Sequence, residues 1–251
     1  HDLAENSSFE EVAYLLIYGE LPTKAQLAEY CEKLISLRAL PDALKSVLEK
    51  IPLATHPMDV LRTGCSFLGN LEPENKNHDQ IFIANRLIAI FPGILLYWFH
   101  FHHHHKKINV SLDDKTLGEY FLHLLHEKKP DPLQAKTVNL SLILYAEHEF
   151  NASTFSARVT AATLSDFYSC IVSAIGTLRG PLHGGANEEA MRLITQFKNA
   201  DLAEAGIKDM LVKKMKVMGF GHRVYKISDP RSDIIKEWSK KLSAKARDGY
   251  L

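Results

Sequence analysis

Two glycine-rich segments decide how this sequence is interpreted: Gly180–Asn187, GPLHGGAN, and Gly219–Tyr225, GFGHRVY. Each holds one histidine, His183 or His222, between glycines. Glycine beside a functional side chain lets the backbone and a ligand approach closely and permits a positive φ angle. Helical periodicity lies between the two segments, so we expect each imidazole at the end of a helix, where it can transfer a proton or hydrogen-bond a carbonyl oxygen. Two satisfied histidines in tight turns would be the alternative, but the pair together favours a functional site.

The bulk composition excludes several partner classes. The 251 residues carry 30 basic and 30 acidic side chains, so net charge gives no argument for binding nucleic acid or an anionic membrane. The longest apolar run, Ile88 to Phe101, falls short of the roughly 20 residues that a membrane helix needs. Cys31, Cys65 and Cys170 are far apart in apolar helical contexts, which suggests a reducing compartment rather than disulfides or a zinc site. We therefore expect a cytoplasmic protein.

The periodicity of apolar residues predicts an all-α protein of roughly a dozen helices. A capping box of Ser8 with Glu11 begins one of them and Thr23 caps the next, while Asp201 with Glu204 is expected to begin another by a capping box. A long apolar helix is expected over residues 80–100 with an interruption near Pro92-Gly93. No alternation typical of strands and no fixed repeat occurs in the sequence.

The second half of the chain contains the expected domain boundary. The longest helix is predicted over residues 152–178, with a buried apolar stripe, and Asn187 is expected to cap the helix after the His183 turn. A change in composition at 184–187 predicts a large helical domain over 1–183 and a smaller one over 184–251. Since the chain begins at His1 and stops after a charged helix, we expect the interior of a longer polypeptide, with the N-terminal part of the large domain and the C-terminal part of the small domain missing.

Two further residues belong with the glycine-flanked histidines. His148 lies at a predicted helix end within Leu144–Thr154, LYAEHEFNAST, and could instead be a helix cap. Arg231 follows Asp229-Pro230, nine residues after His222. An arginine at a helix start, close to a functional histidine, suits bidentate capture of a carboxylate, although alone it would be read as a surface ion pair.

In this order and spacing, the segments resemble the citrate synthase family. The resemblance rests on YAEHEFNAST at 145–154, GPLHGGANE at 180–188, GFGHRVYK at 219–226 and DPR at 229–231, and it extends upstream through HPMDVLR at 56–62 to the start of the chain. Within the family it looks closest to the bacterial 2-methylcitrate synthases, on LLYW at 95–98, FLHLLHEKKP at 121–130 and YAEHEF at 145–150. Many citrate synthases have a histidine where this chain has Tyr145. The resemblance implies a multi-helical fold of two domains that close over substrate, in a symmetric homodimer.

The resemblance also implies an activity. Propionyl-CoA would condense with oxaloacetate and water to give 2-methylcitrate and CoA; acetyl-CoA, giving citrate, is the alternative substrate. By resemblance, His183 is the donor to the thioester oxygen and His222 the donor to the ketone oxygen, while His148 and Arg231 hold oxaloacetate. No metal or further cofactor is implied, since the CoA thioester is itself a substrate. The CoA-binding segment maps to Met215, Lys216, Val217, Met218 and Gly219.

The catalytic base is the main departure from the family pattern. The family's aspartate lies several dozen residues beyond the second glycine-flanked histidine, whereas 29 residues follow His222. Asp166–Ser169, DFYS, looks similar to its context, but it precedes His183 and matches a different family segment. We therefore do not assign Asp166 as the base, and we expect the base and further substrate arginines outside this chain.

Two other classes of function remain open from the residues alone. A non-catalytic helical scaffold is disfavoured because glycines beside both histidines have no packing reason in it. A metallohydrolase could use His100 and His104, which have a suitable spacing but lack the His-Glu-x-x-His pattern. The run His102–His105 is better explained as a solvated helix end than as a metal site, because adjacent residues cannot all face one ion.

Overall fold

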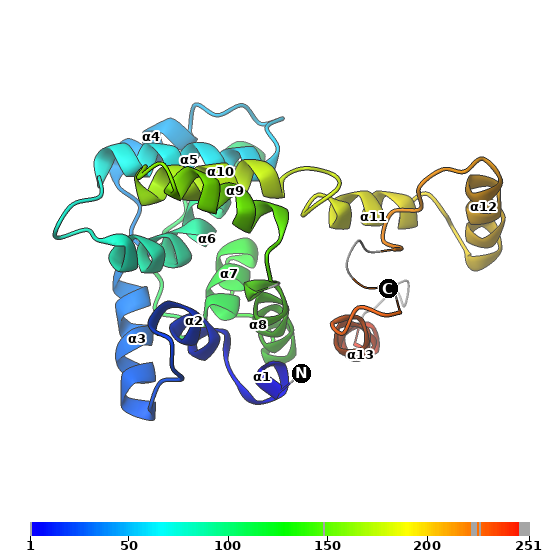
Figure 1. Cartoon of the computed structure of the whole chain (residues 1–251), viewed down its shortest axis with the longest axis horizontal. Helices are drawn as coiled ribbons and strands as arrows, with labels where there is room; N and C mark the ends of the chain where they lie inside the picture. Colours follow the sequence, from blue (N-terminus) through cyan, green and yellow to red (C-terminus); the bar gives the residue numbers. More distant parts are fainter. Residues whose placement is uncertain (1, 148, 222–224, 226, 246–251) are drawn as a thin grey trace.

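The computed structural model describes the chain except for residues 1, 148, 222–224, 226 and 246–251. Every regular element in the described part is a helix, which confirms the all-α class (Figure 1). The helices are α1 (Asp2–Asn6), α2 (Phe9–Tyr18), α3 (Lys24–Ser36), α4 (Asp42–Leu48), α5 (Pro57–Leu71), α6 (Gln80–His104), α7 (Leu117–His126), α8 (Pro132–Ala146), α9 (Ala152–Ala161), α10 (Phe167–Leu178), α11 (Ala186–Ile194), α12 (Ala200–Val212) and α13 (Ser232–Ser243).

Helix α6 forms the centre of the hydrophobic core, and α3, α4, α5, α7 and α10 pack around it. By length and composition α6 could cross a membrane, but 67% of its most apolar window is buried inside the protein, as in a core helix. The predicted interruption at Pro92 is wrong, since the helix runs through it. Proline removes one backbone hydrogen bond from a helix, and the burial of Pro92 in the core holds the helix together at that point. Gly93 packs closely against α7: a Cβ there would lie 3.3 Å from Tyr120 Oη, which is a tight contact.

The capping box predicted at Ser8 and the helix cap predicted at Thr23 are both confirmed. Ser8 Oγ accepts the Glu11 N–H at 3.2 Å while the Glu11 carboxylate accepts the Ser8 N–H. Thr23 and Gln26 make the same reciprocal pair at the start of α3. Each pair satisfies backbone donors that a helix start otherwise leaves without partners.

The single helix predicted over residues 152–178 is wrong, because the chain folds back on itself between α9 and α10. The Asp166 carboxylate begins α10 by accepting the Ser169 N–H at 3.0 Å, and Leu164 just before it adopts a left-handed conformation with φ of 62°. Phe155 and Val159, expected in a buried stripe, are 57% and 52% exposed on the outer face of α9. Asp166 at a helix start was the sequence signal for this break, and the apolar periodicity hid it.

The last three helices lie apart from the core. Helix α11 continues outward from the end of α10, α12 lies beyond it, and α13 returns to the side of α8 (Figure 1). Two predicted caps in this part are wrong: Asn199 rather than Asp201 begins α12, accepting the Leu202 N–H at 2.9 Å, and α11 begins after Gly185 rather than at Asn187. The division into domains at residues 183 and 184 stays a prediction.

Candidate active site

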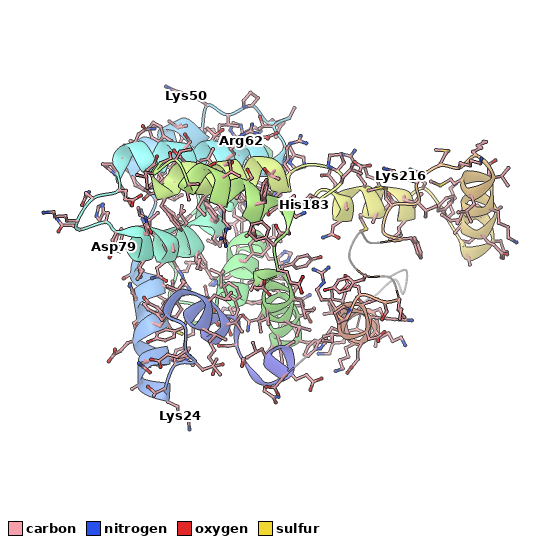
Figure 2. The ribbon with its side chains drawn as sticks, viewed as in Figure 1. Lys24, Lys50, Arg62, Asp79, His183 and Lys216 are labelled. Atoms are coloured by element: carbon pink, nitrogen blue, oxygen red, sulfur yellow. The ribbon has the colours of Figure 1, made fainter. Side chains whose placement is uncertain are left out.

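His183 lies in the tight turn between α10 and α11, where the core meets the outward-pointing helices (Figure 2). The turn is held by backbone hydrogen bonds, with the His183 N–H donating to the Gly180 carbonyl at 2.9 Å. A Cβ at Gly184 would lie 2.6 Å from the Leu178 carbonyl oxygen, and one at Gly185 would lie 2.7 Å from the Arg179 carbonyl oxygen. Neither glycine has a positive φ. These glycines are therefore required for close approach to the end of α10, rather than for the backbone freedom that the sequence suggested.

The His183 ring is oriented by Ser153 in the first turn of α9. Nε2 of His183 lies 3.2 Å from the Ser153 backbone nitrogen and 2.9 Å from Ser153 Oγ. Asn151 caps the same helix, and its Oδ1 accepts the Ser153 and Thr154 N–H groups, each at 3.1 Å. A backbone N–H can only donate, so Nε2 is an acceptor and the ring proton resides on Nδ1. The contact with Ser153 thus fixes both the orientation and the tautomer of His183.

The neutral form of His183 is favoured as well. Burial lowers the pKa of His183 below its usual value of about 6.5. A neutral imidazole whose Nδ1–H is a donor can hydrogen-bond a carbonyl oxygen on which negative charge develops, without itself becoming charged. The turn therefore carries a preorganised donor for a polarised carbonyl group.

Arg231 lies just before α13 and is paired within its own segment. Asp229 accepts from Nε at 3.0 Å and from Nη2 at 2.6 Å, and these hydrogen bonds raise the pKa of Arg231 above its usual value. The guanidinium carbon lies 5.8 Å from the centroid of the Tyr145 ring, and Tyr145 Oη accepts from Asn187 Nδ2 at 2.8 Å. Tyr145 therefore brings together the YAEHEFNAST, GPLHGGAN and DPR segments. The substrate-binding role of Arg231 stays a prediction.

The other predicted site residues are placed in part. His148 and His222 lie outside the described residues. Residues 215–217 follow α12 without regular structure and residues 218–219 form a turn, where Gly219 takes a left-handed conformation with φ of 91°. A Cβ at Gly219 would lie 3.1 Å from the Ala190 Cβ, so the segment runs close to α11. Its CoA-binding role is likewise a prediction.

The residues that were not assigned to the site have structural roles. Asp166 caps α10, and although burial alone would raise its pKa, the hydrogen bonds from Ser169 hold that pKa below its usual range. A carboxyl with a lowered pKa at a helix cap is a poor candidate for a general base. His100 is buried and its Nε2 hydrogen-bonds the Leu124 carbonyl at 2.8 Å. Among the described residues, no group of three His, Cys, Asp or Glu side chains could hold a metal ion.

Ser153 is the site residue that the sequence did not single out. It lies within the quoted segment, but its role depends on a contact with His183, 30 positions away along the chain. The serine at an N-cap+2 position, directly before a helical run, was the only local signal, and such serines are common at helix starts.

Comparison with known proteins places these features in a family. A family model described as citrate synthase, C-terminal domain, matches residues 1–251. The chain is 59% identical over 250 residues to the 2-methylcitrate synthase of Shewanella oneidensis, covering 100% of this chain and 67% of that protein. It is 44% identical over 249 residues to citrate synthase 2 of Bacillus subtilis, covering 96% of this chain and 66% of that protein.

Solved structures give the same result. The citrate synthase of Thermotoga maritima matches with a TM-score of 0.86 at 36% identity, over 98% of this chain and 65% of that one. The Thermoplasma acidophilum citrate synthase, solved as a ternary complex with carboxymethyl coenzyme A and oxaloacetate, matches with a TM-score of 0.89 at 31% identity, over 97% of this chain and 65% of that one. The chain spans about two thirds of the length of these relatives. On the family match, the sequence identity and the shared fold, this chain belongs to the citrate synthase family.

Proposed function

We propose that the protein is a 2-methylcitrate synthase, which condenses propionyl-CoA with oxaloacetate and water to give 2-methylcitrate and CoA. The observation that carries the proposal is the His183–Ser153 contact, which leaves a neutral Nδ1–H donor on a rigid turn. The 59% identity to the Shewanella oneidensis 2-methylcitrate synthase supports propionyl-CoA as the thioester.

The first chemical step is enolisation of the thioester. The Nδ1–H of His183 donates to the thioester oxygen while a carboxylate base, which we place outside this chain, removes a proton from the α-carbon. The negative charge that develops on the oxygen is stabilised by a donor that is already oriented, so little reorganisation is needed in the transition state. A charged imidazolium is less favourable in this partly buried position, which is why the lowered pKa of His183 matters.

The second step forms the carbon–carbon bond. The enol carbon attacks the ketone carbon of oxaloacetate, and His222 gives a proton to the ketone oxygen as it gains charge. His148 and Arg231 hold the oxaloacetate carboxylates. Asp229 already occupies Nε and Nη2 of Arg231, so a substrate carboxylate would bind through Nη1 and the second hydrogen of Nη2. Water then cleaves the thioester, and the C–S bond breaks to release CoA.

The CoA moiety is assigned to Met215, Lys216, Val217, Met218 and Gly219. Backbone amides in such a turn can recognise the edge of an adenine ring whatever the side chains are. The reaction so written needs no metal ion and no further cofactor. We therefore expect the activity to survive dialysis against a chelator. A loss of activity that an added metal ion restores would contradict this part of the proposal.

The test is release of free CoA by the full-length protein. Thiol should appear when propionyl-CoA and oxaloacetate are both present and not with either alone. A helical scaffold without catalytic activity would release none. Acetyl-CoA lacks one methylene, which is worth only about 1–3 kcal/mol in an apolar pocket, so both thioesters should react. If kcat/KM is higher for acetyl-CoA than for propionyl-CoA, the protein is a citrate synthase rather than a 2-methylcitrate synthase.

We also propose a homodimer that buries the outer face of α9 against a second copy. That face presents Phe155 and Val159, and Leu164 beyond it is 94% exposed. Exposed apolar side chains grouped in this way are typical of an interface. Phe155→Glu in the full-length protein should give a monomer by light scattering where the wild-type protein gives a dimer. A monomeric wild type at micromolar concentration would contradict the dimer.

The domain division at 183 and 184 is proposed to permit closure over oxaloacetate in the cytoplasmic enzyme. Closure would exclude water from the thioester before the carbon–carbon bond forms. Small-angle scattering of the full-length protein should show a smaller radius of gyration when oxaloacetate is added. Identical curves with and without oxaloacetate would count against closure.

A further inference from the structure

The first turn of α5 contacts the chain on both sides of His183. Asp59 Oδ2 accepts from Arg179 Nε at 3.0 Å, and Arg179 directly follows Leu178, the last residue of α10. His56 Nε2 lies 2.7 Å from Glu188 Oε2, and Glu188 is in the first turn of α11. His183 lies between Arg179 and Glu188 in the sequence. One helix start therefore holds both ends of the turn that carries His183.

His56 makes two hydrogen bonds that fix its tautomer. Its Nδ1 accepts the Met58 N–H at 3.1 Å, which caps the start of α5. The ring proton therefore resides on Nε2, which donates to Glu188. This hydrogen bond, with help from Arg192, holds the pKa of Glu188 below its usual range, so the acceptor is a carboxylate near neutral pH. A hydrogen bond to a charged group is stronger than one between neutral groups.

Small displacements of this turn matter because the contact of Nε2 with Ser153 orients the His183 ring. The close fit of Gly184 and Gly185 against α10 fixes the turn from one side. The His56–Glu188 hydrogen bond fixes it from the other side, where α11 leads away from the core. A misplacement of about 1 Å can cost roughly a hundredfold in rate.

We infer that His56 is a positioning residue for His183: through Glu188 it holds the turn so that Nε2 of His183 stays on the Ser153 N–H and Nδ1 is directed at the thioester oxygen. This inference rests on the proposed function. It assigns a role to the HPMDVLR segment, 132 positions from its partner, which the reaction itself does not require.

Two substitutions separate positioning from helix capping. His56→Asn keeps a good N-cap acceptor for α5 but is too short to reach Glu188. We expect kcat to fall by roughly 10- to 100-fold, with KM for oxaloacetate and the melting temperature little changed. His56→Gln places an amide donor near the position of Nε2 and should recover most of the lost kcat. Arg62→Ala is the matched control, because it removes the Arg62–Asp59 pair at 3.1 Å and leaves both contacts to the turn.

A double-mutant cycle tests whether His56 acts through His183. In a His183→Ala background, His56→Asn should change the residual kcat by less than about twofold, because residues acting as one unit are not additive. An equal fold-loss in both backgrounds would overturn the inference, and so would an unchanged kcat in His56→Asn alone. If His56→Asn fails to fold, Glu188→Ala removes the same hydrogen bond without touching the cap of α5, and the same outcomes decide. Failure of wild-type protein to release thiol would instead reject the proposed function.

Discussion

Replacing Gly184 by alanine would place a Cβ atom 2.6 Å from the Leu178 carbonyl oxygen and 2.7 Å from Leu178 Cδ1. The side chain of Leu178 can rotate away, but its carbonyl is part of the last turn of α10 and cannot. Since a non-bonded carbon needs roughly 3.5 Å, the His183 turn would have to move by close to 1 Å. We expect a loss of about 1–3 kcal/mol in the free energy of unfolding, as for other overpacked sites.

The same displacement should lower the catalytic rate, because His183 directly precedes Gly184 in the chain. A shift of about 1 Å is expected to lower kcat by roughly 100-fold, while KM for oxaloacetate changes little. Gly176→Ala is the matched control: Gly176 lies inside α10 and an added Cβ meets nothing within 4 Å. Alanine is the better helix former, so this variant should be more stable by about 0.8–1 kcal/mol and fully active.

The assay is denaturant unfolding of both variants beside steady-state thiol release by the full-length protein. Opposite signs for the two glycines would support the reasoning from close approach. A Gly184→Ala protein as stable and as active as the wild type would refute it, because the turn would then have room that the structure does not contain.

Three further outcomes follow from the described contacts. Because burial lowers the pKa of His183, its neutral form persists to more acidic pH than that of an ordinary histidine. We therefore expect kcat/KM to stay constant through neutral pH and to fall with a midpoint below about 6.5. A fall in kcat/KM at higher pH that is assigned to His183 would contradict this. Arg231→Ala should raise KM for oxaloacetate more than it lowers kcat, since a carboxylate contact is already made in the ground state; an unchanged KM in steady-state kinetics would remove Arg231 from the site. Glu10→Ala should cost about 1–3 kcal/mol by denaturant unfolding, because the buried Glu10 carboxylate accepts the Leu117 N–H at 2.7 Å; Glu10→Gln keeps an acceptor there, and an equal loss in both variants would contradict the explanation.

Local signals in the sequence were sufficient for much of the fold. The capping box at Ser8 depends on two side chains three residues apart, and it was predicted from the sequence together with the cap at Thr23. Errors arose where local signals competed. The apolar periodicity of residues 152–178 outweighed Asp166 as a helix start, and Pro92 was given more weight than the burial of α6 around it.

The sequence predicted individual residues of the site but not the contacts between them. His183, Arg231 and the segment at 215–219 stood out by neighbouring glycines, by spacing and by resemblance. Their partners could not be found in this way, because the Ser153 contact with His183 and the His56 contact with Glu188 join positions 30 and 132 residues apart. The tautomer of His183 follows from the direction of a backbone N–H, which only the folded chain defines.

The proposed chemistry depends on His183 being a neutral imidazole with its proton on Nδ1. The most direct test is nitrogen NMR of the full-length protein labelled with ¹⁵N-histidine, with His183 assigned by comparison with the His183→Ala variant. At neutral pH we expect a protonated Nδ1 and an unprotonated Nε2 for His183. A proton on Nε2, or on both ring nitrogens, would contradict it.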